Sequence, residues 1–224
     1  MPSGPRKIRL SSSEKARIAK IFDQFAAALV EPRTELDYKS PFTLLVAVVL
    51  SAQSTDKQVN LATKKLFALA ATPREIAALG VEGLIPLISS IGLFRTKARN
   101  VIALSRLILE RFDGEVPLER ERLESLPGVG RKTASVVLNE LGAEKAVAVD
   151  THVFRVAHRL KLSNGKTPSE VEHDLMAVIP PTHLRRAHHW LILHGRYVCL
   201  ARKPRCEACL IADLCPSREL YVGA

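Results

Sequence analysis

Long apolar runs and a secretory leader are missing from this sequence, and each absence excludes a class of protein. The longest apolar run extends only from Phe42 to Ala52. A helix needs about 20 apolar residues to cross a bilayer. The basic start, MPSGPRKIRL, is not followed by the apolar stretch of a secretory signal. The sequence therefore favours a cytoplasmic protein without a membrane span, and the apolar run is typical of a buried core helix.

Acidic residues are scarce in relation to basic ones. The chain has 33 Lys and Arg against 23 Asp and Glu, which gives a formal charge of +10. Such an excess favours a polyanionic partner, because each phosphate contact releases counterions. Binding to an anionic membrane would require a basic amphipathic anchor or a lipidation motif. The sequence contains neither, so nucleic acid is the expected partner.

Strand patterns are almost absent, and helix signals dominate. Only KAVAV, at 145–149, resembles a strand, and it is too short to begin a sheet. Asp56 is expected to cap one helix, and the amphipathic segment RTKARNVIALSRLILERF is expected to end at Asp113-Gly114. The chain is therefore predicted to be all-α. Further helix starts are predicted from capping residues that precede Pro or a Glu, at Ser11, Ser40, Thr72 and Thr167.

Cysteine is confined to the C-terminal end of the chain. The four residues are Cys199, Cys206, Cys209 and Cys215, with the spacing C-x6-C-x2-C-x5-C. Two disulfides would suit a secreted protein, so a single metal site with four thiolate ligands is the preferred interpretation. Zinc ribbons usually have two CxxC pairs, whereas an iron-sulfur cluster accepts wider and uneven spacing. Spacing alone does not choose between zinc and iron-sulfur.

The six residues between the first two cysteines form a cationic loop. Its sequence is LARKPR, which includes Arg202, Lys203 and Arg205. A run of charges is usually only a solvated surface. Here metal ligands would hold both ends of the loop, so a polyanion would bind it with a smaller ordering cost. The loop is therefore a candidate contact for nucleic acid.

A glycine-rich turn stands in LPGVGRKT, where Gly128 and Gly130 precede Arg131 and Lys132. The segment matches neither a P-loop nor a Rossmann turn. A helix is predicted on each side of it, so the motif is helix, tight turn, helix. Such a hairpin can point backbone N–H groups at a phosphate, and the missing side chains allow a close approach. Considered alone, Lys132 is more often a phosphate clamp than a nucleophile.

Asp150 follows the apolar run AVAV and begins a predicted helix. Its ordinary role in that position is to cap the helix. His152, two residues later, is more often a structural histidine than a catalyst. Considered alone, neither residue indicates catalysis.

Together, LPGVGRKTAS, VDTHVFRV and the cysteine spacing resemble the endonuclease III family of helix-hairpin-helix (HhH-GPD) DNA glycosylases. The resemblance extends from about Ser11 to Cys215 and includes LLVAVVLSAQSTD and SSIGLF. It implies two all-helical lobes with a DNA-binding cleft between them. One lobe is a six-helix domain over 34–145 with the hairpin, and the other is an iron-sulfur cluster domain from 1–33 plus 146–224. It also implies that the four cysteines hold a structural 4Fe-4S cluster.

The resemblance further implies the chemistry of a bifunctional DNA glycosylase and AP lyase. Lys132 would attack C1′ of a damaged nucleotide that has been taken out of the stack, forming an imine, and β-elimination would follow. This requires an unprotonated amine, which Arg131 and partial desolvation are expected to favour. Asp150 would stabilise the cationic sugar and assist proton transfer.

Filling the gap left by that nucleotide requires inserted side chains. The resemblance assigns this role to Gln53 and Leu93, with Ile91 in support. Gly128, Gly130, Arg131 and His152 would also contact DNA, together with the cationic loop.

The expected partner is double-stranded DNA that contains damaged pyrimidines or abasic sites, bound by a monomer in the cytoplasm at the nucleoid. Mismatch-specific glycosylases of the same superfamily are one alternative, but they lack the lysine that Lys132 supplies. A non-catalytic iron-sulfur protein that only binds DNA is the other. The presence of both Lys132 and Asp150 argues against it.

Overall fold

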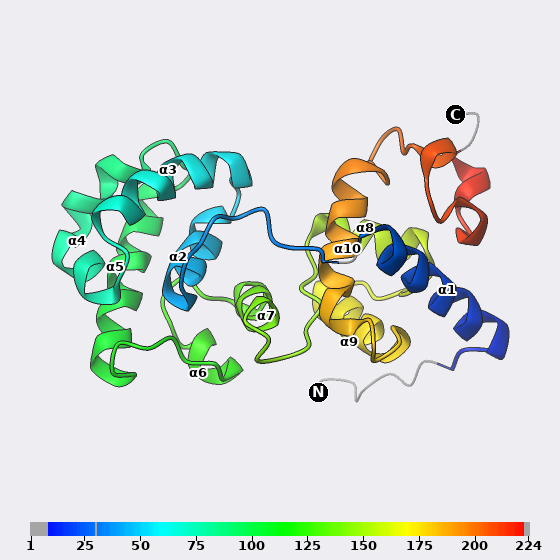
Figure 1. Ribbon diagram of the computed structural model, residues 1–224, viewed down its shortest axis with the longest axis horizontal. Coiled ribbons are helices and arrows are strands. Elements are labelled where there is room, and N and C mark those ends of the chain that lie inside the picture. The colour runs from blue at the N-terminus through cyan, green and yellow to red at the C-terminus, as the bar shows by residue number, and fades with distance from the viewer. Residues whose placement is uncertain (1–8, 30, 222–224) are drawn as a thin grey trace. The chain divides into compact units, whose positions relative to one another are not determined.

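The computed structural model describes residues 9–29 and 31–221, and these contain helices and no β-strand (Figure 1). The predicted all-α fold is confirmed. The chain divides into two compact units. Thr34–Glu144 forms the first unit, and the segments on either side of it, up to Arg33 and from Lys145, form the second.

The first unit is built around one almost entirely apolar helix, α2 (Pro41–Ser51), in which every residue from Phe42 to Leu50 is buried. This is the long apolar run of the sequence, and it lies in a protein core as predicted. The remaining helices of this unit are α3 (Asp56–Leu69), α4 (Pro73–Ile88), α5 (Phe94–Arg111), α6 (Arg120–Glu124) and α7 (Arg131–Glu140). Helix α2 packs against α3, α5 and α7, and α4 packs along α5.

The second unit combines the N-terminal helix with the C-terminal third of the chain. Phe22 and Phe25 of α1 (Ser12–Ala28) share the core of this unit with Trp190, whose indole N–H donates to the carbonyl of Leu29 at 2.9 Å. Aromatic packing therefore joins the two ends of the sequence. The other α-helices of this unit are α8 (Thr151–Arg159), α9 (Pro168–Val178) and α10 (Leu184–Tyr197), followed by the short 3-10 helices η1 (Cys206–Ala208), η2 (Ala212–Leu214) and η3 (Arg218–Leu220).

The capping signals placed most helix starts correctly. Capping boxes begin α1 at Ser11, α4 at Thr72 and α9 at Thr167. The prediction for α3 was wrong by one residue, because Thr55 accepts the bond from the Gln58 N–H and Asp56 is already helical. A hydroxyl with Gln three residues later forms the capping box there, which leaves the acidic side chain in the first turn.

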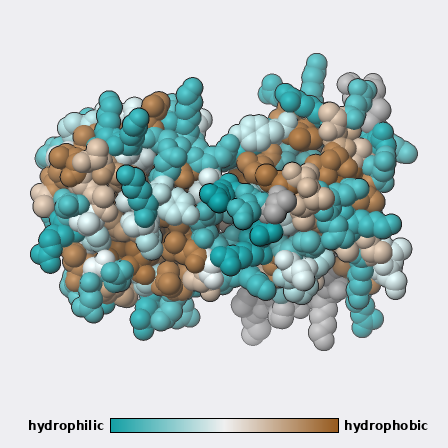
Figure 2. All heavy atoms as spheres, in the orientation of Figure 1, coloured by the Kyte–Doolittle hydropathy of each residue, from teal (hydrophilic) through white to brown (hydrophobic). Residues whose placement is uncertain are grey.

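The strand-like segment 145–149 begins the C-terminal part of the second unit and forms neither helix nor strand. Residues 146–149 are nevertheless buried, which accounts for their apolar character. No helix within the described ranges is both long and apolar enough to cross a membrane. Figure 2 shows polar side chains over much of the visible face of each unit, with apolar atoms between them.

Candidate functional site

The hairpin consists of α6, the turn through Gly128 and Gly130, and α7. Arg120, at the start of α6, donates to Ser135 Oγ at 3.0 Å and to Glu144 at 2.8 Å. It therefore joins the first helix of the hairpin to the second and to the segment after it. Leu126 and Val129 are buried beneath the turn. The hairpin is thus held by packing and by one multiply bonded arginine.

The two glycines of the turn have different surroundings. Gly128 has φ +81°, and a Cβ there would lie 2.9 Å from Asn100 Nδ2. Its missing side chain is therefore required by the fold. Gly130 has an ordinary extended backbone, and a Cβ there would meet nothing within 4 Å among the described residues. Gly130 is the position where a missing side chain leaves room for a ligand.

Lys132 lies in the first turn of α7, two residues after that open position. Gly130 is the N-cap, and no side chain caps the start of α7, where the positive end of the helix dipole favours an anion. The side chain of Lys132 is exposed. Partial desolvation of this amine is expected from the sequence, and the exposed position of the side chain does not provide it.

Asp150 is the N-cap of α8, and its Oδ1 accepts from the N–H groups of His152 at 2.9 Å and Val153 at 2.8 Å. Both bonds use the same oxygen, so Oδ2 keeps its capacity to accept a proton or to face a cation. The cap fixes the carboxylate rotamer at the start of the helix. The ordinary structural role and a catalytic role are therefore compatible in this residue.

His152 belongs to a contact between α8 and α10. Its ring Nδ1 lies 3.3 Å from Arg155 Nη2, and Arg155 also donates to the carbonyls of Gly195 and Cys199 at 2.8 and 3.1 Å. A Cβ on Gly195 would lie 2.9 Å from His152 Cβ. Because the two helices approach closely, Arg155 contacts both His152 at the start of α8 and the carbonyl of the first cysteine, Cys199.

The four cysteines line a single hollow, together with Arg159 and Arg205 among others. All four are free thiols. Burial raises the pKa of Cys209 and Cys215, and the neighbouring cysteines add to this. Four thiolates gathered here therefore need a cationic group to stabilise them.

The donor set also indicates what kind of group fits. Four free cysteine thiols line one hollow, and four thiolates are the donor set that holds an iron-sulfur cluster. Burial lowers the pKa of His194, beside Cys209, to about 4, so this neighbour adds no charge at neutral pH.

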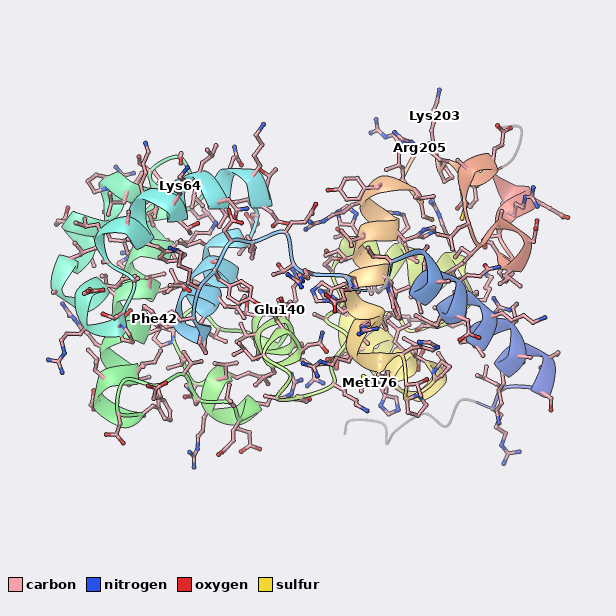
Figure 3. The ribbon with its side chains drawn as sticks, viewed as in Figure 1. Phe42, Lys64, Glu140, Met176, Lys203 and Arg205 are labelled. Atoms are coloured by element: carbon pink, nitrogen blue, oxygen red, sulfur yellow. The ribbon has the colours of Figure 1, made fainter. Side chains whose placement is uncertain are left out.

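The cationic loop is held at both of its ends. Arg159 donates to the carbonyls of Leu200 and Ala201 at 2.6 and 2.8 Å, and to Cys199 Sγ at 3.3 Å. The backbone N–H of Arg205 donates to the Val198 carbonyl, and this bond closes the loop. Arg202, Lys203 and Arg205 are all exposed, and Figure 3 shows Lys203 and Arg205 extending away from the backbone of the loop. Fixed carbonyls with outward-pointing cations make a preformed anion-binding surface.

Gln53 and Leu93 occupy two neighbouring turns of the first unit. Both have left-handed backbones, with φ +54° and +58°, and both are exposed. Leu93 exposes 60% of its surface, whereas Ile91 exposes 2% and belongs to the core. Ile91 thus packs beneath the turn that presents Leu93. An exposed leucine in a left-handed conformation is unusual and indicates a functional constraint.

Sequence reasoning missed the residues that support these groups. Asn100 and Arg120 support the hairpin, and their sequence context gave no signal of it. Arg155 and Arg159 stand four residues apart on α8, which places them on one face of that helix. That spacing was a signal that could have been used. Lys132 belongs to the first unit, while Asp150, the cysteines and the cationic loop belong to the second.

Comparison with known proteins gives matches over most of the chain. The family profile of the HhH-GPD superfamily of base excision DNA repair proteins matches residues 46–181. A second profile, the iron-sulfur binding domain of endonuclease III, matches residues 199–215. The first of these spans more than half of the chain, and the second contains all four cysteines.

Individual relatives agree with the profiles. Endonuclease III of Rickettsia conorii is 55% identical over 198 residues, which cover 88% of this chain and 94% of the relative. Endonuclease III of Escherichia coli K12 is 51% identical over 205 residues, covering 92% and 97%. A solved structure described as a trapped endonuclease III-DNA covalent intermediate superposes with a TM-score of 0.87 at 42% identity, covering 96% of this chain and all of that one.

Proposed function

The chain belongs to the endonuclease III family within the HhH-GPD superfamily, and from this membership we propose that it is a bifunctional DNA glycosylase and AP lyase of base excision repair. Its substrate is duplex DNA that carries an oxidised pyrimidine, or the abasic site left after base removal. It acts as a monomer. The observation that carries the proposal is the exposed Lys132 side chain in the first turn of α7, two residues after the open Gly130 position.

Lys132 is the nucleophile of the proposed reaction. Its Nζ lone pair forms a bond to C1′ while the bond from C1′ to the base breaks, and the base leaves with a proton. Loss of a proton from Nζ and opening of the sugar ring at O4′ give an iminium ion. Removal of a C2′ proton then breaks the C3′–O bond and releases the 3′ phosphate. Hydrolysis of the iminium frees the enzyme.

The carboxylate of Asp150 stabilises the positive charge that develops on the sugar. Its Oδ1 is committed to the helix cap, so Oδ2 is the oxygen that faces the developing sugar cation and accepts or returns protons. The extended DNA surface is supplied by the backbone N–H groups of α7 and by the cationic loop. Arg131 and His152 are assigned the nearest phosphate contacts.

The four cysteines hold a 4Fe-4S cluster. When bound, the cluster supplies cationic iron to four thiolates and crosslinks the segment from Cys199 to Cys215. Base removal does not pass through it. Arg159 binds the carbonyls of Leu200 and Ala201 beside the first ligand, which restrains the start of the cationic loop.

Borohydride trapping tests the proposal, because it reduces the iminium ion to a stable crosslink. A nucleophile must be unprotonated, which a guanidinium cannot readily be, whereas a phosphate clamp needs only charge. Lys132→Gln and Lys132→Arg should therefore both lose trapping and nicking on a duplex with one oxidised pyrimidine, while duplex binding is largely kept. Lys64→Gln, which removes the same charge from an exposed position on α3 (Figure 3), is the matched control and should trap normally. Robust trapping by Lys132→Gln would assign the iminium to another amine.

A further inference from the structure

One lysine of the first unit is buried in a way that the proposed chemistry does not use. Lys97, on α5, exposes 5% of its surface. Its ammonium donates to the carbonyls of Leu50 at 2.9 Å and Ala52 at 2.5 Å, and to Ser54 Oγ at 3.1 Å. All three N–H bonds of the ammonium are thus matched by oxygens of one short segment. Burial lowers the pKa of Lys97, so the three bonds are needed to keep the charge there.

These bonds complete the end of α2. The last carbonyls of a helix have no partner within the helix. Ser51 Oγ donates to the Val48 carbonyl, and the Ser54 N–H donates to the Ser51 carbonyl. Lys97 donates to the carbonyls of Leu50 and Ala52, and its charge lies at the negative end of the helix dipole. The turn that follows α2 is therefore fixed from α5.

Gln53 lies between two residues that Lys97 binds. Its left-handed backbone is unfavourable for a residue with a side chain. The Ala52 carbonyl on one side and the Ser54 hydroxyl on the other both accept from the same ammonium. A strained conformation persists only where the surrounding structure holds it in place. Here the two bonds from Lys97 hold the backbone on both sides of Gln53.

The same lysine also belongs to the turn that presents Leu93. The backbone N–H of Lys97 donates to the Leu93 carbonyl at 3.0 Å, and this is the first hydrogen bond of α5. Leu93 is itself left-handed and lacks a side-chain cap. The two turns are adjacent, since a Cβ on Gly92 would lie 3.5 Å from the Gln53 carbonyl oxygen. Lys97 therefore connects both turns through its backbone and its side chain.

From this we infer that Lys97 is a positioning residue, which holds Gln53 and Leu93 together as one preformed wedge for insertion into the duplex. The inference rests on the proposed function. A preformed wedge pays its ordering cost during folding, so that insertion into the stack does not have to. Loss of Lys97 should then slow extrusion of the damaged nucleotide and leave the chemistry at Lys132 intact.

The test compares two substrates in single-turnover assays at 25 °C. Lys97→Met keeps an unbranched side chain that is shorter by one atom, and it removes the ammonium with all three donors. We expect base removal from an oxidised pyrimidine in duplex to fall about 30-fold, or about 2 kcal/mol at the transition state. Strand cleavage at a pre-formed abasic site should fall less than about 3-fold, because extrusion costs least where the base is already missing.

Ile108→Ala is the control for a general loss of stability. It leaves a cavity at a fully buried position of the same helix, away from both turns. At a temperature where circular dichroism shows this variant to be folded, its rates on the two substrates should fall by the same factor or not at all. Ser54→Ala removes one of the three acceptors and keeps the lysine, so it provides a milder variant should Lys97→Met fail to fold. We expect a few-fold loss on the oxidised pyrimidine alone.

Equal losses on both substrates in Lys97→Met, or in Ser54→Ala if the first does not fold, would overturn the inference and leave Lys97 a stabilising residue. That outcome is distinct from failure of the proposed function, in which the wild type itself would neither nick nor be trapped. A fluorescent base opposite the lesion gives a readout that stability does not move. Its unstacking signal should be delayed in Lys97→Met and unchanged in Ile108→Ala, and an unchanged signal in Lys97→Met would refute the wedge.

Discussion

The two glycines of the hairpin turn should separate folding from DNA binding when each is replaced by alanine. Gly128→Ala places a side chain at φ +81°, which costs about 1–2 kcal/mol for an L-residue. The new Cβ would also lie 2.9 Å from Asn100 Nδ2 and 3.0 Å from Asn100 Cβ, so Asn100 must move. We expect a loss of about 2–3 kcal/mol, which for a chain of this size lowers Tm by roughly 4–12 °C.

Gly130→Ala should behave in the opposite way. Its backbone is extended and the space around it is open, so alanine fits without strain. Alanine stabilises by about 0.4–1 kcal/mol through the unfolded chain, and it is a poorer N-cap than glycine by a similar amount. Tm should therefore change by no more than about 2 °C. The added methyl group would meet a bound phosphate, and duplex affinity should fall about tenfold, or about 1.4 kcal/mol.

Thermal unfolding by circular dichroism and fluorescence anisotropy with an abasic-analogue duplex measure the two effects. The double variant Gly128→Ala with Asn100→Ala removes the contact with Asn100 Nδ2 and keeps both the 3.0 Å approach to the Cβ of residue 100 and the strained φ. It should therefore recover part of the loss and be more stable than the sum of its single changes predicts. The reasoning fails if Gly130→Ala unfolds as early as Gly128→Ala while binding DNA normally. It also fails if Gly128→Ala is as stable as wild type.

Four further outcomes are expected. Leu93→Ala should slow base removal from intact duplex more than cleavage at a pre-formed abasic site, and equal losses in kinetic assays would point to a packing role. Lys203→Ala should weaken binding to all duplexes alike and reduce the slope of log K against log salt by roughly one; a lesion-dependent loss would contradict this. Asp150→Asn should keep the α8 cap, because Asn caps as well as Asp, and Tm should hold while turnover falls by about 10²-fold or more. Cys206→Ser should lower the iron content below about four per chain and unfold the C-terminal segment, as metal analysis and circular dichroism would detect; one zinc per wild-type chain would disprove the cluster.

Local signals in the sequence predicted the helices well, because their energies come from neighbouring residues. Ser11 with Glu14 and Thr167 with Glu170 form the capping boxes that their spacing indicates. Thr55 was passed over in favour of Asp56, since both are good caps and only the Gln58 contact decides between them. The all-α class followed from the same local rules.

Contacts between distant residues could not be obtained in this way. The hairpin motif was visible in the sequence, yet the reason for Gly128 is Asn100, which stands on another helix. Lys97 looks like any cation of an amphipathic segment, and only its three acceptors, more than 40 residues earlier, distinguish it. The roles of Lys132 and Asp150 came from family resemblance, because a phosphate clamp and a helix cap are the commoner uses of those residue types.

The second unit is assembled from both ends of the chain, and this has a consequence for synthesis on the ribosome. Phe25 of α1 emerges 165 residues before Trp190, its stacking partner at 6.4 Å. At 5–20 residues per second this delay lasts roughly 8–33 s. The apolar face of α1 stays without its core during that time, while Thr34–Glu144 can already fold. A nascent chain stalled before α10 would therefore display Phe22 and Phe25 to chaperones and proteases, although its hairpin would be complete.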